Sequence, residues 1–356
     1  MNILVIDLAA EHSGALNLLQ CIHKEIVDYG KDNFFLMISV PQLDESSNLK
    51  IFRYPQVKKS WIKRLYYDSI GAWCLAKKYK ADMILSLQNT LLCPTNCFKV
   101  LYMQQSLQYL DENNTMREDG FKLWFRKKII GKIINLSSKY ADVIFVQTQW
   151  IKERLMRDID CSDEKITVIE PNTNIDRQKY RYRGGSRCNR FFYPAGAMPY
   201  KNHMVILRAS KLLKEEGIND FTVTFTFEGN SEYIRQLKGY VNKYDLPVEF
   251  AGRLPHEEVL QRYTESVLIF TSEIETFGFP LREMSIVGGP IIATDRPYSN
   301  DVVGDYKNTV FVEHKNADAL KEAMKMFVTG QYNYICEDYV CEPNNLVKEV
   351  INSYAK

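Results

Sequence analysis

The feature that most constrains the fold is a regular alternation of short apolar runs with longer amphipathic stretches. Runs rich in β-branched and aromatic residues form a first series at Ile3–Leu8, Phe34–Val40, Met83–Leu87, Val100–Met103, Val143–Gln147 and Ile166–Glu170. A second series follows at Phe191–Tyr193, Phe221–Phe227, Val248–Ala251, Val267–Thr271, Ile291–Thr294 and Val310–Val312. Helical spacing between the runs, as at Val205–Glu216 and Glu257–Tyr263, predicts parallel sheets covered by helices, so the expected fold class is α/β.

Two series of strands in one chain predict two doubly wound domains. The 356 residues exceed one typical domain, which holds about 150. The seam is expected within Pro171–Arg190, a stretch without apolar period that contains Gly184 and Gly185. We therefore predict an N-terminal domain over 1–175 and a C-terminal domain over 176–340. A helical tail over 341–356 is expected to pack back on the first domain.

Charge and cysteine usage exclude several classes of protein. Lys and Arg together number 46 and Asp and Glu 44, so the net charge of +2 argues against a nucleic-acid partner. The 8 cysteines are scattered and make no C-x2-C pair, which favours reduced thiols over a zinc site. A strand-like run begins almost at the first residue and no apolar run is long enough to span a membrane. We expect a cytoplasmic protein, at most peripheral on the inner face of the cytoplasmic membrane.

One segment, Phe121–Ala141, is strongly basic. It holds no acid, and its basic residues are Lys122, Arg126, Lys127, Lys128, Lys132 and Lys139. Its apolar residues recur at three-to-four spacing: Phe125, Ile129, Ile130, Ile133 and Ile134. One interpretation is a surface helix whose apolar stripe packs on the sheet. The other is a basic amphipathic helix that docks on anionic lipid, extended by the basic and aromatic cluster at Lys58–Arg64.

The densest chemical signal is the block Val267–Asp295, which reads as strand, loop, helix, glycine stop and strand. Pro280 suits the first turn of the helix, and Gly278 lets a ligand approach the helix N-terminus, where phosphate is favoured. Glu275 lies in the loop before the helix and Glu283 lies one turn inside it. This placement allows one carboxylate to reach a sugar while the other accepts hydrogen bonds from ribose hydroxyls.

The same block resembles the E-x7-E region of the retaining, GT-B-fold glycosyltransferases of the group 1 (family 4) class. The shared core reads E-[GT]-F-G-[FL]-P, which is ETFGFP here. Other segments fit in order: Val143–Leu155, Ile166–Asp176, Pro194–His203 and Phe250–Tyr263. The resemblance covers most of Val143–Tyr306 and implies two Rossmann-like domains that face each other across a cleft.

The resemblance assigns roles to residues that match the family pattern. Glu275 would contact the transferred sugar, Glu283 the donor ribose, and Lys201 the donor diphosphate. Backbone N–H groups of Gly278 and Phe279 would face the sugar and phosphate. The remaining donor-side residues implied are Thr276, Phe277 and Gly14.

Two departures from the family pattern concern phosphate and acceptor. Ala197 stands where many members have an arginine, and Gln104 and Gln105 stand where many have a histidine near the acceptor. Glutamine can hydrogen-bond a sugar hydroxyl but cannot act as a base at neutral pH. His12, after the first strand, could face the cleft, although a solvated loop histidine is the simpler interpretation.

The resemblance implies a retaining, hexosyltransferase-type enzyme that needs neither metal nor cofactor. It would transfer sugar from a nucleotide diphosphate sugar to a saccharide or lipid-linked acceptor, as in lipopolysaccharide or capsule synthesis. Because Ala197 and Gln104 depart from the pattern, a non-catalytic sugar-nucleotide-binding partner subunit is the alternative. A nucleotide-sugar epimerase or a phosphorylase is a further alternative, with no supporting signature in the sequence.

Overall fold

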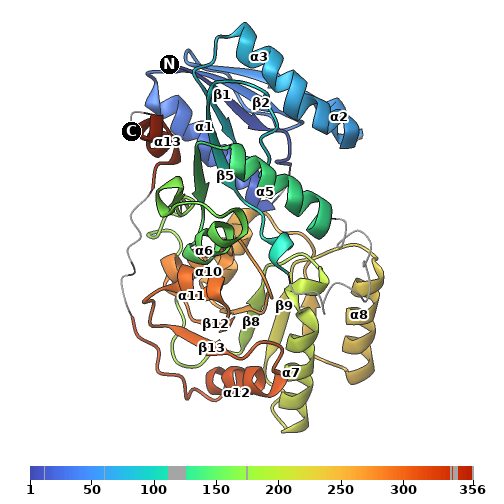
Figure 1. Ribbon diagram of the computed structural model, residues 1–356. Coiled ribbons are helices and arrows are strands. Elements are labelled where there is room, and N and C mark those ends of the chain that lie inside the picture. The colour runs from blue at the N-terminus through green and yellow to red at the C-terminus, as the bar shows by residue number, and fades with distance from the viewer. Residues whose placement is uncertain are drawn as a thin grey trace. The chain divides into compact units, whose positions relative to one another are not determined.

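The chain forms two compact units, each built on one parallel sheet (Figure 1). The computed structural model describes residues 1–11, 13–59, 61–110, 126–173, 175–336, 339 and 344–354. Unit 1 comprises Met1–Gln108, Lys122–Asn172 and Pro343–Lys356, and unit 2 comprises Tyr109–Phe121 and Thr173–Glu342. The predicted His12 and Phe125 lie outside the described residues.

Unit 1 carries a seven-stranded sheet in the order β3-β2-β1-β4-β5-β6-β7. Its strands are β1 (Asn2–Asp7), β2 (Asn33–Ile38), β3 (Leu49–Arg53), β4 (Met83–Ser86), β5 (Phe98–Met103), β6 (Val143–Val146) and β7 (Ile166–Val168). Every pairing between them is parallel, with β1 central between β2 and β4. The strand order reverses between β1 and β4, as in doubly wound folds.

Helices cover both faces of this sheet. They are α1 (Ser13–Tyr29), α2 (Trp61–Tyr66), the π-helix η2 (Tyr67–Gly71), α3 (Ala72–Lys78), the π-helix η5 (Arg126–Ile130), α5 (Gly131–Tyr140), α6 (Gln149–Ile159) and α13 (Leu346–Tyr354). Short 3-10 turns occur at η1 (Pro55–Lys59), η3 (Leu107–Tyr109) and η6 (Asp163–Lys165). Right-handed crossovers place α1 on one face, and α2, α3 and α5 on the other, because the chain crosses the sheet in opposite directions.

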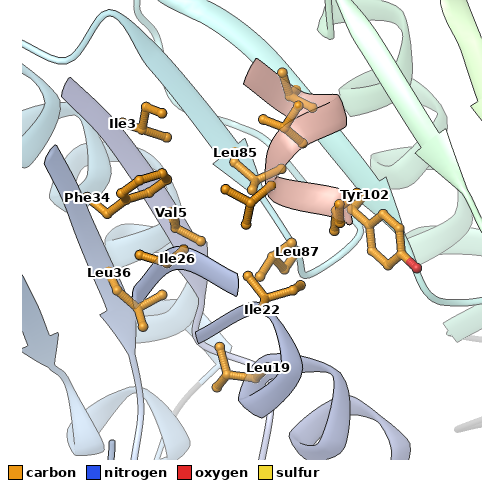
Figure 2. Close-up of a cluster of buried hydrophobic side chains, with 14 of the residues drawn as sticks. Ile3, Val5, Leu19, Ile22, Ile26, Phe34, Leu36, Leu85, Leu87 and Tyr102 are labelled. Carbon is orange, nitrogen blue, oxygen red and sulfur yellow. The ribbon is translucent and has the colours of Figure 1, made fainter. Parts of the chain in front are cut away.

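The core of unit 1 lies between the sheet and the α1 face (Figure 2). Leu19, Ile22 and Ile26 of α1 pack against Val5 and Leu36 of the sheet, and all of them are buried. The tail helix α13 contributes Leu346, Val347 and Val350 to the same cluster. The helix α13 is therefore part of the core of unit 1.

Unit 2 repeats this plan with a six-stranded sheet in the order β10-β9-β8-β11-β12-β13. Its strands are β8 (Arg190–Tyr193), β9 (Thr222–Phe225), β10 (Val248–Phe250), β11 (Val267–Phe270), β12 (Ile291–Thr294) and β13 (Thr309–Val312). Its helices are the 3-10 turn η7 (Pro199–Lys201), α7 (His203–Glu215), α8 (Glu232–Tyr244), α9 (His256–Tyr263), α10 (Phe279–Val287), α11 (Pro297–Val303) and α12 (Ala317–Val328).

The twelve apolar runs singled out in the sequence are strands in the structure, which confirms the alternation. The sequence analysis missed β3, in which Lys50 and Arg53 interrupt the apolar residues. This strand lies at the edge of its sheet, where alternating burial replaces a continuous apolar run. Parallel strands with both faces covered are apolar throughout, so the central ones were easier to find.

The stretch Pro171–Arg190, expected to be a linker, has irregular structure but packs on unit 2. Tyr180 and Tyr182 are buried, and the backbone N–H of Tyr182 donates to the carbonyl of Val287 at 2.9 Å. The N–H of Arg183 donates to the carbonyl of Thr264 at 2.8 Å. Backbone hydrogen bonds and buried aromatic rings thus fix most of this stretch to one unit.

Candidate functional site

The chemically richest edge of unit 2 is where its strand order reverses, between β8 and β11. Ligands in open parallel sheets bind outside the carboxyl ends of the strands at such a reversal. The loop after β8 carries Lys201, and the loop after β11 carries Glu275. Two residues separated by 74 positions in the sequence are thereby brought together.

Hydrogen bonds join the two loops. The hydroxyls of Tyr193 and Thr271 both donate to the carbonyl of Lys201, at 2.8 and 3.1 Å. The backbone N–H of Glu273 donates to the carbonyl of Tyr200 at 2.7 Å. Because Tyr193 is fully buried, this arrangement is anchored in the core and holds the backbone around Lys201 in place.

Lys201 and Glu275 form an ion pair through Nζ and Oε1. Their side chains are 17% and 16% exposed, so solvent screens the pair only partly. Burial disfavours the charged ammonium, but the Glu275 carboxylate and Tyr200 outweigh it and raise the pKa of Lys201. The lysine is therefore cationic at neutral pH, at a strand end where an anionic ligand would arrive.

The helix α10 begins beside this pair with a glycine in the left-handed region. Gly278 has φ +86°, a conformation that side chains rarely adopt, and a Cβ there would meet Leu281 and Phe270 at 3.4 Å. The backbone thus turns sharply and presents the N-terminus of α10 at the strand end. Phe277 is buried, with its ring edge-on to Phe279 at 5.4 Å, while Thr276 is half-buried. The predicted glycine, proline and glycine-stop positions of this helix are confirmed.

Glu283 lies inside α10 with both carboxylate oxygens engaged. Oε2 accepts a hydrogen bond from the Tyr263 hydroxyl at 3.1 Å, and Oε1 lies 2.9 Å from Nε2 of His256. The glutamate and the tyrosine are buried, whereas the histidine is 46% exposed. The hydrogen bond to Glu283 raises the pKa of His256 against the opposing effect of burial. Burial and the nearby Glu283 carboxylate raise the pKa of Tyr263 well above its usual value.

Sequence reasoning missed His256 and Tyr263 as partners of this glutamate. Both lie on α9, within the segment that the resemblance covers, but they precede Glu283 by 27 and 20 residues. No local spacing rule links residues that far apart. The signal available in the sequence was the helical spacing of α9. His256 and Tyr263 lie two turns apart and therefore share one face of this helix.

Glu273 is a second buried acid of the same loop that sequence reasoning did not single out. Its carboxylate lies 3.2 Å from Nζ of Lys315 and 3.7 Å from Nε2 of His314. Burial opposes its ionisation, but His314 and Lys315 outweigh burial and lower the pKa of Glu273. The guanidinium of Arg296 donates to the Glu273 carbonyl at 3.1 Å. These contacts fix the loop that presents Glu275.

Neither Arg253 nor Arg282, the two arginines nearest to the family motif, is recorded in contact with the ion pair. Ala197 is half-buried in the loop after β8, and Arg253 is exposed. Arg282 is buried, with its guanidinium over the Phe277 ring at 5.8 Å and hydrogen-bonded to the Tyr339 hydroxyl. Lys201 is therefore the cation that the structure places beside Glu275. The neighbouring His203 is buried among aromatic rings, and burial lowers the pKa of His203 to about 3.

The corresponding edge of unit 1 is built from amides. Gln104 follows β5, with its backbone N–H donating to the Asn89 side chain and its Nε2 donating to the Leu87 carbonyl at 2.6 Å. Gln105 has a buried Nε2 without a hydrogen-bond partner among the described residues. Gly14 lies in the first turn of α1, after β1. The structure thus brings Gln104 and Gln105 to the carboxyl ends of the strands.

A buried carboxyl group supports this amide-rich edge. Asp68, in the π-helix η2, accepts hydrogen bonds from Nε2 of Gln88 and from the Thr90 hydroxyl, the latter at 2.7 Å. Oε1 of Gln88 in turn accepts the backbone N–H of Leu8 at 3.0 Å. Burial raises the pKa of Asp68 to about 6, against the opposing effects of Thr90 and Arg64. Gln88 therefore joins the loop after β4 to the loop after β1, and Asp68 holds this glutamine in place.

Three wider observations bear on the expected chemistry. Among the described residues, no group of three or more His, Cys, Asp and Glu is placed to hold a metal ion. The described cysteines are free thiols, and Cys341 lies outside the described residues. In the part of the chain that the structure describes, no helix is both long and apolar enough to cross a bilayer.

Comparison with family models gives a match within the second unit. Residues 176–338 match the family model of the glycosyl transferases group 1. These residues contain Lys201, Glu275, Glu283 and Gly278. No curated protein sequence matches the chain.

Solved structures show the fold of the whole chain. Sucrose-phosphate synthase from Thermosynechococcus elongatus superposes with a TM-score of 0.69 at 15% identity, covering 92% of each chain. HepE from Anabaena, in complex with UDP and glucose, gives 0.67 at 13% identity and covers 99% of each chain. The lipopolysaccharide outer core galactosyltransferase WaaB, in its apo form, gives 0.67 at 15% identity, covering 94% of this chain and 92% of that chain. The predicted α/β GT-B fold, with two Rossmann-like domains, is confirmed.

Proposed function

We propose that the protein is a glycosyltransferase that transfers a sugar from a nucleotide diphosphate sugar to a saccharide or lipid-linked acceptor. The observation that carries the proposal is the ion pair between Lys201 and Glu275 at the strand-order reversal of unit 2. The buried Glu283 lies on α10, the helix that follows the loop of Glu275. The match of residues 176–338 to the group 1 glycosyl transferases supports it. The complex of HepE with UDP and glucose supports a UDP-sugar as donor.

Each site residue of unit 2 has its own role in donor binding or in the reaction. Lys201 neutralises the charge that develops on the departing diphosphate, because a fixed cation stabilises a leaving anion. The N–H groups at the start of α10, from Gly278 and Phe279, add partial positive charge at the same place. Glu275 contacts the transferred sugar. Glu283 accepts hydrogen bonds from ribose, because each of its oxygens keeps a second lone pair after bonding His256 and Tyr263.

The transfer is proposed to retain anomeric configuration through attack on the face from which the diphosphate leaves. In that case the leaving phosphate oxygen takes the acceptor proton, and the amides Gln104 and Gln105 need only orient the acceptor. Metal would not be required. The anomeric proton coupling of the product, measured by NMR with and without a chelator, tests both points; an inverted product or a chelator-sensitive rate would contradict them.

A surface-polysaccharide role, in lipopolysaccharide or capsule synthesis, is the context that we propose for this activity. The similar fold of the lipopolysaccharide galactosyltransferase WaaB is consistent with it. Such acceptors are assembled on lipid carriers at the cytoplasmic membrane, so a peripheral location on its inner face is part of the proposal. The basic segment 121–141 was the first candidate for the membrane contact, and its described part, Arg126–Ala141, is helical as expected up to Tyr140.

The decisive experiment is a thermal-shift panel of UDP-, GDP-, ADP- and CDP-sugars with the free diphosphates. A ligand at about 100 times its dissociation constant stabilises the fold by about 2.7 kcal/mol, so the melting temperature rises. One nucleotide class should give a clear shift, and Lys201→Ala should reduce it while Lys238→Ala, an exposed lysine on α8, should not. A shift without sugar transfer to any acceptor would favour the non-catalytic partner subunit. An unchanged melting temperature with every ligand of the panel would contradict the proposal.

A further inference from the structure

A second surface, far in sequence from the donor site, carries exposed apolar side chains on unit 1. Tyr66, Ile70 and Trp73 are 50%, 46% and 39% exposed along the continuous helical segment α2–η2–α3. They are spaced by four and three residues, so they share one face. The opposite face is buried through Asp68, Ala72 and Leu75. The helical segment is therefore two-faced, with its inner face on the sheet and an apolar outer face.

The exposed charges of this segment have a single sign. The basic residues of the segment and of its C-terminal end are Lys63, Arg64, Lys77, Lys78 and Lys80, while its single acid, Asp68, is buried. The Lys77 ammonium lies 5.3 Å from the centre of the Trp73 ring, so cation and aromatic ring share one patch. Tryptophan and tyrosine beside lysines match the interface of a bilayer, where one part of each side chain is apolar and the other is wet.

The π-helix η2 carries both an inward and an outward side chain. Asp68 is directed inward to Gln88 and Thr90. Ile70, two residues later in the same turn, points outward. Of the basic residues of this segment, Arg64 interacts with the buried Asp68, while Lys77 and Lys78 lie exposed at its C-terminal end.

The helix α5 adds a parallel stripe on the same face of the sheet. Ile129, Leu136 and Tyr140 are exposed along η5 and α5, beside Lys132 and Lys139. The packing expected for this stripe is only partly right: Ile134 is fully buried, but Ile129 is exposed. The crossovers that carry α3 and α5 run in the same direction across the sheet, so both helices lie opposite α1 and α13 (Figure 1).

We infer that the outer face formed by Tyr66, Ile70 and Trp73, with Lys77 and Lys78, docks on an anionic lipid surface. Apolar insertion and attraction to lipid charge act together there, as for helices that lie in the plane of a membrane. An acidic protein would be attracted by the same lysines, but three spaced apolar side chains along one helical face suit a fluid surface better. The inference deepens the proposed peripheral location without depending on sugar transfer.

The test is co-sedimentation of the full chain with vesicles of phosphatidylcholine containing about one third phosphatidylglycerol. We expect binding to these vesicles and at least about tenfold less to pure phosphatidylcholine, with partial loss in high salt. The triple variant Tyr66→Ser, Ile70→Ser, Trp73→Ser should lose binding by at least about tenfold. The matched control Val27→Ser, Phe311→Ser, Ile335→Ser removes three other exposed apolar side chains and should bind like wild type.

Charge reversal separates the two contributions. Lys77→Glu with Lys78→Glu should abolish binding to anionic vesicles, whereas Lys238→Glu with Lys243→Glu on α8, with the same change in net charge, should not. Melting curves establish that each variant is folded. Equal vesicle binding by the triple variant and wild type, or no binding by wild type at low salt, would overturn the inference, the latter favouring an acidic protein partner. Thermal shifts with nucleotide sugars are expected to be unchanged in the triple variant, so failure of this inference is distinct from failure of the proposed activity.

Discussion

The two units place different chemistry on the same architecture. Both sheets are parallel and reverse their strand order, yet unit 2 presents charged pairs at the reversal and unit 1 presents amides. Lys201 and Glu275 lie beside each other with partial exposure, so their charges can act on a ligand. Gln104 donates to a backbone carbonyl and Asp68 is buried behind the loops. Unit 2 thus carries an ion pair at its strand ends, whereas unit 1 carries hydrogen-bonded amide side chains there.

The largest effect should come from removing Glu275, the acid that we propose contacts the transferred sugar. Glu275→Gln is expected to lower turnover by about 10²–10³, the size found when a group that acts on the transition state is removed. Affinity for free nucleotide should change less than about twofold. Steady-state transfer kinetics and nucleotide thermal shifts separate the two effects. Glu257→Gln, an exposed acid on α9, is the control; loss of nucleotide affinity with full turnover would reverse the assignment.

The next effect concerns the buried acid of unit 1 and is a pH dependence of stability. The pKa of Asp68 is about 6 in the folded chain and 3.8 as its ordinary value. The folded state therefore binds this proton more tightly, so the contribution of Asp68 to the free energy of unfolding is greatest below about pH 4 and declines as pH rises to about 6. A shift of this size corresponds to about 3 kcal/mol.

Chemical denaturation of wild type and Asp68→Asn from about pH 4 to about pH 7 measures this contribution. The difference in unfolding free energy between the two proteins should vary with pH across that window, because only wild type titrates at residue 68. Asp142→Asn, an exposed acid at the start of β6, provides the comparison. A difference that stays constant with pH would show that Asp68 does not titrate as its burial requires.

A smaller effect is expected from Glu283, the acid that we propose binds the donor ribose. Glu283→Ala should weaken nucleotide binding by about 1–3 kcal/mol, because ribose hydroxyls lose their acceptor. Glu283→Gln should retain part of the affinity, since its amide oxygen still accepts one hydrogen bond. Calorimetric titration with free nucleotide measures both variants. Unchanged affinity in Glu283→Ala would remove this residue from the donor site.

The smallest effect is a pH dependence of nucleotide binding through His256. The pKa of His256 is raised by its bond to Glu283, so as pH falls the protonated ring holds the carboxylate more firmly. Nucleotide affinity should then fall by about fivefold below that pKa, a change in the range of one hydrogen bond. His256→Asn should flatten the profile between about pH 5.5 and about pH 8. A profile that stays as steep in the variant would assign the dependence to another group.

The sequence by itself determined the sheets and the local shape of the donor loop. Buried parallel strands are continuous apolar runs, and a glycine–proline start with a glycine stop defines α10. The relevant information lies within a few neighbouring residues in each case. The positions of Glu275, Glu283 and Gly278 around the start of this helix therefore follow from the order of the amino acids alone.

Tertiary structure alone decided which side chains meet. The pairing of Lys201 with Glu275 and of Glu283 with His256 depends on neighbouring strands and helices that are distant in sequence. The helical segment that holds Asp68 and Ile70 passes through a π-helix, whose wider turn no 3.6-residue periodicity predicts. The edge strand β3 was not predicted for a related reason, because the burial of its side chains depends on the elements packed beside it. Local preferences act over one turn or one strand, whereas charge pairing and burial act through space, after the chain has folded.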